Sequence, residues 1–250
     1  MLFLGEILIL CYITVVVYAQ NEWCDPKLCA PGKKHIGCFD GGYPRWESIC
    51  ERPEEIKITP ELQNIILHEH NKLRNQQALG LTPYFSPATR MATMTWDNDL
   101  AATAHYNTLQ CEMKHDECRG TYDFYYAGQN LAKNADLNAT EIAKWAPGYW
   151  FEEWMYADMS DIFEHTRSQL SNGEWIGHFT QIVKDDCVKV GCAISKFSER
   201  GSRRSLITCN YSMTNIKNSP IYEVGPTASH CKTGTNYYYP GLCSVYEKYE

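Results

Sequence analysis

Twelve cysteines among 250 residues constrain this chain more than any other feature. A cytosolic protein of this size carries so many only when they hold metal ions or iron–sulfur clusters, whereas an exported protein pairs them as disulfides. The Cys-x-x-Cys spacing that is typical of zinc sites is absent from the sequence. We therefore expect a disulfide framework, whose connectivity the sequence leaves open.

The amino-terminal segment predicts export. Residues 7–17 form an uninterrupted apolar run, ILILCYITVVV, which is shorter than the about 20 residues of a spanning helix. We expect residues 1–19 to be a signal peptide cleaved after Ala19, with an uncleaved anchor as the alternative. No later stretch is apolar enough to span a bilayer, so we expect a secreted protein and not an integral membrane protein. Cys11 leaves with the signal, and eleven cysteines remain.

The charge balance excludes some function classes. The chain carries 30 acidic and 23 basic residues, for a net charge of -7. Such an acidic protein does not offer the basic surface that nucleic acids or anionic membranes attract. We therefore expect no nucleic-acid partner.

The chain divides into three parts behind the signal. Residues 20–53 form a head in which four cysteines stand among many glycines and prolines, too few apolar residues to build a core without disulfides. Residues 54–213 form the body. Residues 214–250 form a tail rich in Asn, Pro, Gly and Tyr, which we expect to be an extended arm tied by Cys231 and Cys243.

Helical signals dominate the first half of the body. Thr59 and Pro60 predict the start of a helix, and Gly80 predicts its end. Its expected polar face carries His68, His70, Asn71 and Arg74. A second helix is predicted from Met91 to about Gln110. A third helical region over residues 140–158 contains Pro147, which we expect to begin a new helix rather than to kink a continuous one.

Strand signals dominate the second half of the body. Short runs rich in β-branched and aromatic residues predict strands over residues 178–183, 188–197 and 206–211. Residues 201–204 are expected to form a hairpin loop between the last two. Helices followed by antiparallel strands predict an α+β domain in layers.

Few residues in this chain suggest chemistry by their spacing. His115, His178 and Glu153 could together bind Zn²⁺ if the fold brings them together, but no His-Glu-x-x-His motif supports the site. A serine nucleophile motif and a phosphate-binding loop are both absent from the sequence. Asn138 and Asn210 begin glycosylation sequons, and Asn138 is favoured because it is expected in a loop.

Several motifs together resemble one family. GHFTQIV at residues 177–183 and LITCNY at residues 206–211 are similar to two signatures of the CAP superfamily, which includes cysteine-rich secretory proteins and antigen 5. GQNLA at residues 128–132 is similar to a further family motif, and the resemblance spans residues 53–213. The head, with CDPKLC at residues 24–29, resembles the insect antigen 5 branch and especially its fly and horsefly salivary members.

The resemblance implies a fold and most of a disulfide framework. The fold is a three-layer α-β-α sandwich, with a small antiparallel sheet between helices. The implied pairs are Cys24–Cys38, Cys29–Cys118, Cys50–Cys111 and Cys192–Cys209, to which we add Cys231–Cys243 for the tail. Cys187 is left unpaired. It is expected to be a buried inert thiol, with an intermolecular disulfide as the alternative.

The resemblance also implies a central cleft. Two histidines and two acids line this cleft in the family and bind a divalent metal in some members. His115, His178 and Glu153 match these positions, while Gln129 replaces the second acid, which should weaken cation binding. We expect no required cofactor and at most a weakly bound Zn²⁺. Lys184 stands where the family usually has tryptophan.

The function implied is binding rather than catalysis. The chain is identified as a non-enzymatic salivary or venom protein that acts on a host, with an anti-haemostatic effect. One expected partner is a platelet or vascular receptor, bound through the head loop of Pro31, Gly32, Lys33 and Lys34, which lacks the Arg-Gly-Asp of some horsefly members. The other is a small hydrophobic lipid bound in the body. A metal-dependent hydrolase and a structural or defence protein of haemolymph are the alternatives.

Overall fold

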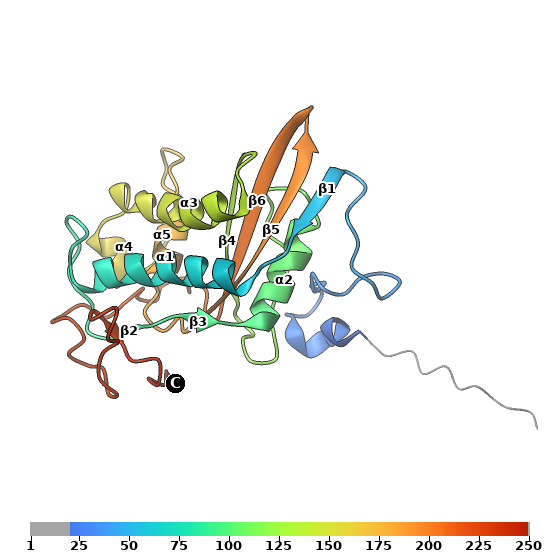
Figure 1. Ribbon diagram of the computed structural model, residues 1–250. Helices are drawn as coiled ribbons and strands as arrows, with labels where there is room; N and C mark the ends of the chain where they lie inside the picture. Colours follow the sequence, from blue (N-terminus) through green and yellow to red (C-terminus); the bar gives the residue numbers. More distant parts are fainter. Residues whose placement is uncertain (1–20, 250) are drawn as a thin grey trace, which may run out of the picture.

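The computed structural model describes residues 21–249 and shows a sheet with helices on both sides (Figure 1). The predicted signal peptide, residues 1–19, lies outside the described residues. Within residues 21–249, no helix has the length and apolarity needed to cross a membrane. The helices are η1 Glu22–Cys24, η2 Pro26–Leu28, α1 Pro60–Ala78, α2 Asn98–Thr108, α3 Ala139–Phe151, η3 Glu152–Met155, α4 Met159–Phe163 and α5 Gly177–Ile182. The strands are β1 Glu51–Ile56, β2 Met91–Ala92, β3 Thr95–Trp96, β4 Gly128–Ala135, β5 Lys189–Glu199, β6 Ser202–Tyr211 and β7 Leu242–Cys243.

The main sheet is antiparallel, in the order β1-β5-β6-β4, with β3 parallel to the start of β5. Strands β5 and β6 form the predicted hairpin, but its turn is tighter than the expected loop over residues 201–204. Arg200 and Gly201 adopt positive φ angles of 50° and 80°, and β6 begins at the next residue. Two consecutive residues at positive φ are typical of the two-residue turns whose twist matches that of paired strands.

Side chains of β6 alternate between two helical layers. Thr208 and Asn210 point toward α2, where they bond Asn107 and Thr103 at 2.9 Å each. Tyr211 points toward the opposite face, where its hydroxyl donates to Nε2 of His70 on α1 at 2.9 Å. Because successive strand residues face opposite sides of a sheet, α2 covers one face while α1 and α3 cover the other. The expected three-layer α-β-α sandwich is confirmed.

Helix α1 begins and ends where the sequence predicts. The Thr59 hydroxyl caps the helix by accepting from the backbone N–H of Leu62, and Gly80 has a φ of +69° just beyond the end. The expected polar face of α1 does not lie in solvent as a whole, since His70, Asn71 and Arg74 are buried. They bond groups of the core instead of water.

Arg74 ties α1 to the chain around it. Its completely buried guanidinium makes five hydrogen bonds of 2.7–3.2 Å to four backbone carbonyls, and its pKa is lowered by burial. These carbonyls belong to Ala92, Ile182, Lys184 and Asp185. One fixed planar donor group therefore holds β2 and the segment between α5 and β5 against α1.

Two predicted helices differ from the structure. The helix expected from Met91 contains only Asn98–Thr108, because Asp97 caps it by accepting from the N–H groups of Asp99 and Leu100. The residues before the cap form β2 and β3. Pro147 does not begin a new helix but lies inside α3. Burial of one face of α3 against the core outweighs the cost of about 3 kcal/mol for a proline inside a helix, which lacks an N–H donor and crowds the preceding turn.

The strand predicted over residues 178–183 is also wrong. This segment forms α5, Gly177–Ile182, whose residues Phe179–Ile182 are buried on more than one side. A short apolar run fits a buried strand and a buried helix equally well by pattern alone. Strands β1 and β4 were not predicted, and β1 crosses the boundary between the head and the body expected after residue 53.

Five disulfides staple the described chain. They join Cys24–Cys38, Cys29–Cys118, Cys50–Cys111, Cys192–Cys209 and Cys231–Cys243, the five pairs stated above. Trp23 and Leu28 of the head pack against Tyr106 of α2. The head therefore uses the body as its core.

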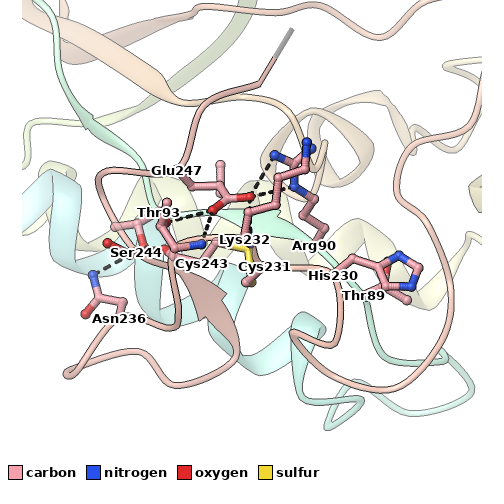
Figure 2. The surroundings of a disulfide bond; sticks show 12 residues. Thr89, Arg90, Thr93, His230, Cys231, Lys232, Asn236, Cys243, Ser244 and Glu247 are labelled. Atoms are coloured by element: carbon pink, nitrogen blue, oxygen red, sulfur yellow. Dashed lines mark hydrogen bonds and ion pairs between the residues drawn. A yellow bond between two sulfur atoms is a disulfide. The ribbon is translucent and has the colours of Figure 1, made fainter.

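The tail runs back over the body and is fixed at its end (Figure 2). Strand β7 pairs in parallel with β2, and the Cys231–Cys243 disulfide closes a loop beside it. The carboxylate of Glu247 accepts from Arg90 at 2.7 Å and from the hydroxyl and N–H of Thr233 at 2.7 and 2.8 Å. The expected disulfide-tied arm is therefore also held by a buried charge.

Candidate functional site

The two predicted histidines line one cleft. His178 lies near the start of α5, and His115 lies in the loop between α2 and β4. Both contribute to a cleft of about 240 Å³, together with Trp175 and Gln129. The fold thus brings His115, Gln129 and His178 to one cleft. Glu153 contacts His178 but does not line this cleft.

Glu153 holds α5 and orients His178. One carboxylate oxygen of Glu153 accepts from Nδ1 of His178 at 2.5 Å. The other accepts from the backbone N–H groups of His178 at 2.8 Å and of Phe179 at 3.2 Å. Ile176, at the helix start, provides no side-chain cap, so Glu153 supplies the acceptor that the first turn needs. This contact keeps the proton on Nδ1 and leaves Nε2 of His178 available to a ligand.

Gln129 orients His115 in the same manner. Its amide oxygen accepts from Nδ1 of His115 at 2.7 Å. Its amide nitrogen donates to Asp116 at 2.8 Å and to Asn210 at 3.0 Å. Both donors of the amide therefore have acceptors. A glutamate at this position would place a second carboxylate against Asp116, which already pairs with Arg119 at 2.6 Å. Burial lowers the pKa of His115, so the ring is neutral at pH 7.

The cleft residues do not fit a tightly held metal ion. No group of three or more histidine, cysteine or acidic side chains in residues 21–249 is placed to share one cation. Both oxygens of Glu153 already have donors, which leaves two imidazole nitrogens, fewer than the three protein ligands of a catalytic zinc site.

Sequence reasoning missed Asp116 and Arg119. Asp116 and Arg119 have opposite charges and lie three residues apart in the same loop, where they form an ion pair. Trp175 gave no signal, because nothing in its local sequence shows that the fold places it beside His178.

The head loop is exposed in the structure. Pro31, Gly32, Lys33 and Lys34 are all exposed, and the two lysines make surface ion pairs. Lys33 pairs with Glu117 at 3.6 Å, and Lys34 pairs with Asp40 at 3.2 Å. Surface pairs of this kind contribute about 0–1 kcal/mol, so a partner can displace them.

The two predicted glycosylation sites differ in access. Asn138 is exposed at the start of α3, where its side-chain oxygen caps the helix and its nitrogen remains free. Asn210 is completely buried, and its nitrogen donates to Thr103. A glycan cannot be joined to Asn210 in this fold, so that expectation is corrected.

The segment that departs from the family pattern is packed inside. Lys184 is buried and pairs with Asp185 at 3.2 Å and Asp186 at 3.0 Å. Cys187 is completely buried without a disulfide partner among the described residues. Its sulfur lies 3.6 Å from the hydroxyl of Ser212. The structure therefore has a buried thiol, which would have to become exposed before it could form an intermolecular disulfide.

The chain is similar in sequence and in fold to known proteins. Residues 67–211 match the model of the cysteine-rich secretory protein family, CAP. Venom allergen-1 of Aedes aegypti is 37% identical over 91% of this chain and 89% of its own length. This chain belongs to the CAP family. Tabinhibitin 3 of Tabanus yao is 27% identical to this CAP protein, over 86% of this chain and 84% of its own. The crystal structure of NaASP2 with Zn²⁺ has 29% identity and a TM-score of 0.63, and the match covers 74% of this chain and 96% of that one.

Proposed function

We propose that this CAP protein is a secreted, non-enzymatic protein of the antigen 5 kind that binds a target in a host and impairs haemostasis. The similarity to a venom allergen and to a horsefly Tabinhibitin supports the class, and five disulfides support an extracellular location. The non-enzymatic part rests on the sequence, in which neither a serine nucleophile motif nor a His-Glu-x-x-His motif occurs.

The head loop carries this proposal. Two disulfides, Cys24–Cys38 and Cys29–Cys118, hold the segment on either side of Pro31–Lys34, and the loop itself is exposed. A short loop on a stapled base loses little conformational entropy on binding. Its lysines suit an acidic patch on a platelet or vascular receptor. The lipid route rests on the family resemblance alone.

Platelet aggregation with the purified protein tests the proposal. We expect inhibition by the natural chain and its loss in the double variant Lys33→Ala with Lys34→Ala. Lys57→Ala with Lys217→Ala is the matched control, because both lysines are exposed and make no ion pair among the described residues. Retained inhibition in the head variant would move the contact to the body. No inhibition with any agonist, together with no lipid co-purifying by mass spectrometry, would refute the binding function.

We also propose that the cleft holds Zn²⁺ only weakly, through Nε2 of His115 and Nε2 of His178. Gln129→Glu adds a carboxylate 2.8 Å from Asp116, so it should lower the melting temperature in metal-free buffer and recover it when zinc is added. His178→Ala should abolish zinc binding in calorimetry. Tight binding by the natural chain, or no response of the Gln129→Glu variant to zinc, would contradict this assignment.

A further inference from the structure

A second cleft opens on the other side of Trp175. It has a volume of about 210 Å³ and lies between the end of α3, η3 and the turn over residues 169–175. Tyr149, Tyr156 and Trp175 line it, with exposed fractions of 51%, 44% and 50%. Large aromatic side chains that gather half-exposed around one hollow mark a binding surface more often than a solvated one. We call this site the aromatic cleft.

The walls of the aromatic cleft are fixed without a ligand. The ring of Tyr149 stacks on Trp145, with ring centres 4.7 Å apart and planes 20° from parallel. Trp175 forms a β-bridge with Gln169, and Leu170 N–H donates to the carbonyl of Glu174 at 2.8 Å. The aromatic surfaces are therefore already in place, which lowers the entropy cost of binding.

The charge in the aromatic cleft is negative and uncompensated. Glu152 and Glu174 line the same hollow, and across residues 21–249 neither carboxylate takes part in an ion pair. Glu153 also reaches this cleft, but its carboxylate is committed to His178 and α5. Two free carboxylates beside aromatic faces repel anions and attract cations.

We propose that the aromatic cleft binds a small organic ammonium ion. The faces of aromatic rings carry negative potential and attract weakly hydrated cations, and nearby carboxylates add to that attraction. A metal ion does not suit the site, because hard cations need several converging oxygens, and within residues 21–249 no three acidic, histidine or cysteine side chains are placed to share one ion. The site shares Trp175 with the histidine cleft, but neither histidine nor any residue of the head loop lines it, so this proposal does not depend on the function proposed above.

Titration calorimetry in phosphate buffer tests the proposal with defined probes. We expect choline and phenethylammonium to bind saturably, and dimethylbutanol, the uncharged carbon isostere of choline, to bind at least about tenfold more weakly. Glu152→Gln with Glu174→Gln should weaken binding of both cations by about tenfold. Glu47→Gln with Glu51→Gln removes the same charge from exposed positions elsewhere and should leave the affinity unchanged.

The aromatic contribution is tested at one ring. Trp175→Phe keeps an aromatic face and should retain most of the affinity, whereas Trp175→Leu keeps an apolar side chain without that face and should lose about fivefold or more. Circular dichroism and the melting temperature establish that each variant is folded. Equal binding of choline and its isostere, equal affinity of the Leu and Phe variants, or no binding of either cation up to about 10 mM would each overturn the proposal.

Discussion

The contact that fixes the tail depends on a buried charge whose contribution changes with pH. The side chain of Glu247 is 1% exposed, and Arg90, which pairs with it, is 21% exposed. Burial by itself would raise the pKa of Glu247. Hydrogen bonds from Thr233, the backbone of Lys232 and Arg90 outweigh burial and lower the pKa from 4.5 to about 2. The folded state thus prefers the ionised carboxylate.

The sign and size of the effect follow from this shift. A carboxylate whose pKa is lower in the folded state stabilises that state fully above its unfolded pKa of 4.5, and the stabilisation is lost as the pH falls toward 2. A fall in the pKa from 4.5 to about 2 corresponds to about 3–3.5 kcal/mol. Glu247→Gln keeps the shape but removes the charge, so the tail should lose about that free energy at pH 7.

Hydrogen exchange over residues 231–249 and urea unfolding measure this change at pH 7 and pH 3. At pH 3, more than half of the difference between the natural chain and Glu247→Gln should be gone, because the unfolded chain is then protonated. Glu117→Gln is the control, since its pair with Lys33 is exposed and should contribute less than about 1 kcal/mol. A difference that is the same at both pH values, or equal to that of the control, would refute the reasoning.

Three further outcomes test the described contacts. Arg74→Met leaves four buried carbonyls without their donor and should lower the free energy of unfolding by about 3–5 kcal/mol in urea, while Arg45→Met, at an exposed position, should change it by less than about 0.5 kcal/mol. Burial raises the pKa of Cys187, so its thiol should react with a disulfide reagent only after denaturation. Non-reducing electrophoresis should show no dimer. Rapid reaction of the folded protein with the reagent would contradict this prediction. Glycosidase treatment of the protein secreted from insect cells should shift its mobility, and Asn138→Gln alone should remove that shift; a glycan left on the Asn138→Gln variant would show that another site is used.

Local signals predicted the elements that local contacts determine. Helix α1 begins at the Thr59 cap, and β5 and β6 have the β-branched alternation of paired strands. Helix α5 could not be predicted from local signals, because its first turn is capped by Glu153, 25 residues earlier in the chain. Strand β4 is similar in this respect, since its sequence GQNLAKNA has few strand-forming residues and its ladder with β6 holds it in place.

The candidate site was likewise predictable only in part. The resemblance placed His115, His178 and Glu153 around one cleft, and the structure brings the histidines there. The sequence could not show that each carboxylate near the cleft already accepts hydrogen bonds that hold the fold together. Glu153 caps α5, and Asp116 is shared between Arg119 and Gln129.

The hydrogen bonds around Asp116 explain why an amide suits position 129. An amide can donate to Asp116 and Asn210 while it accepts from His115, and so satisfies three neighbours at once. A carboxylate offers only acceptors, and it would repel Asp116 unless a cation or a proton entered the cleft. The glutamine therefore stabilises a hydrogen-bonded cleft that has no second carboxylate beside Asp116.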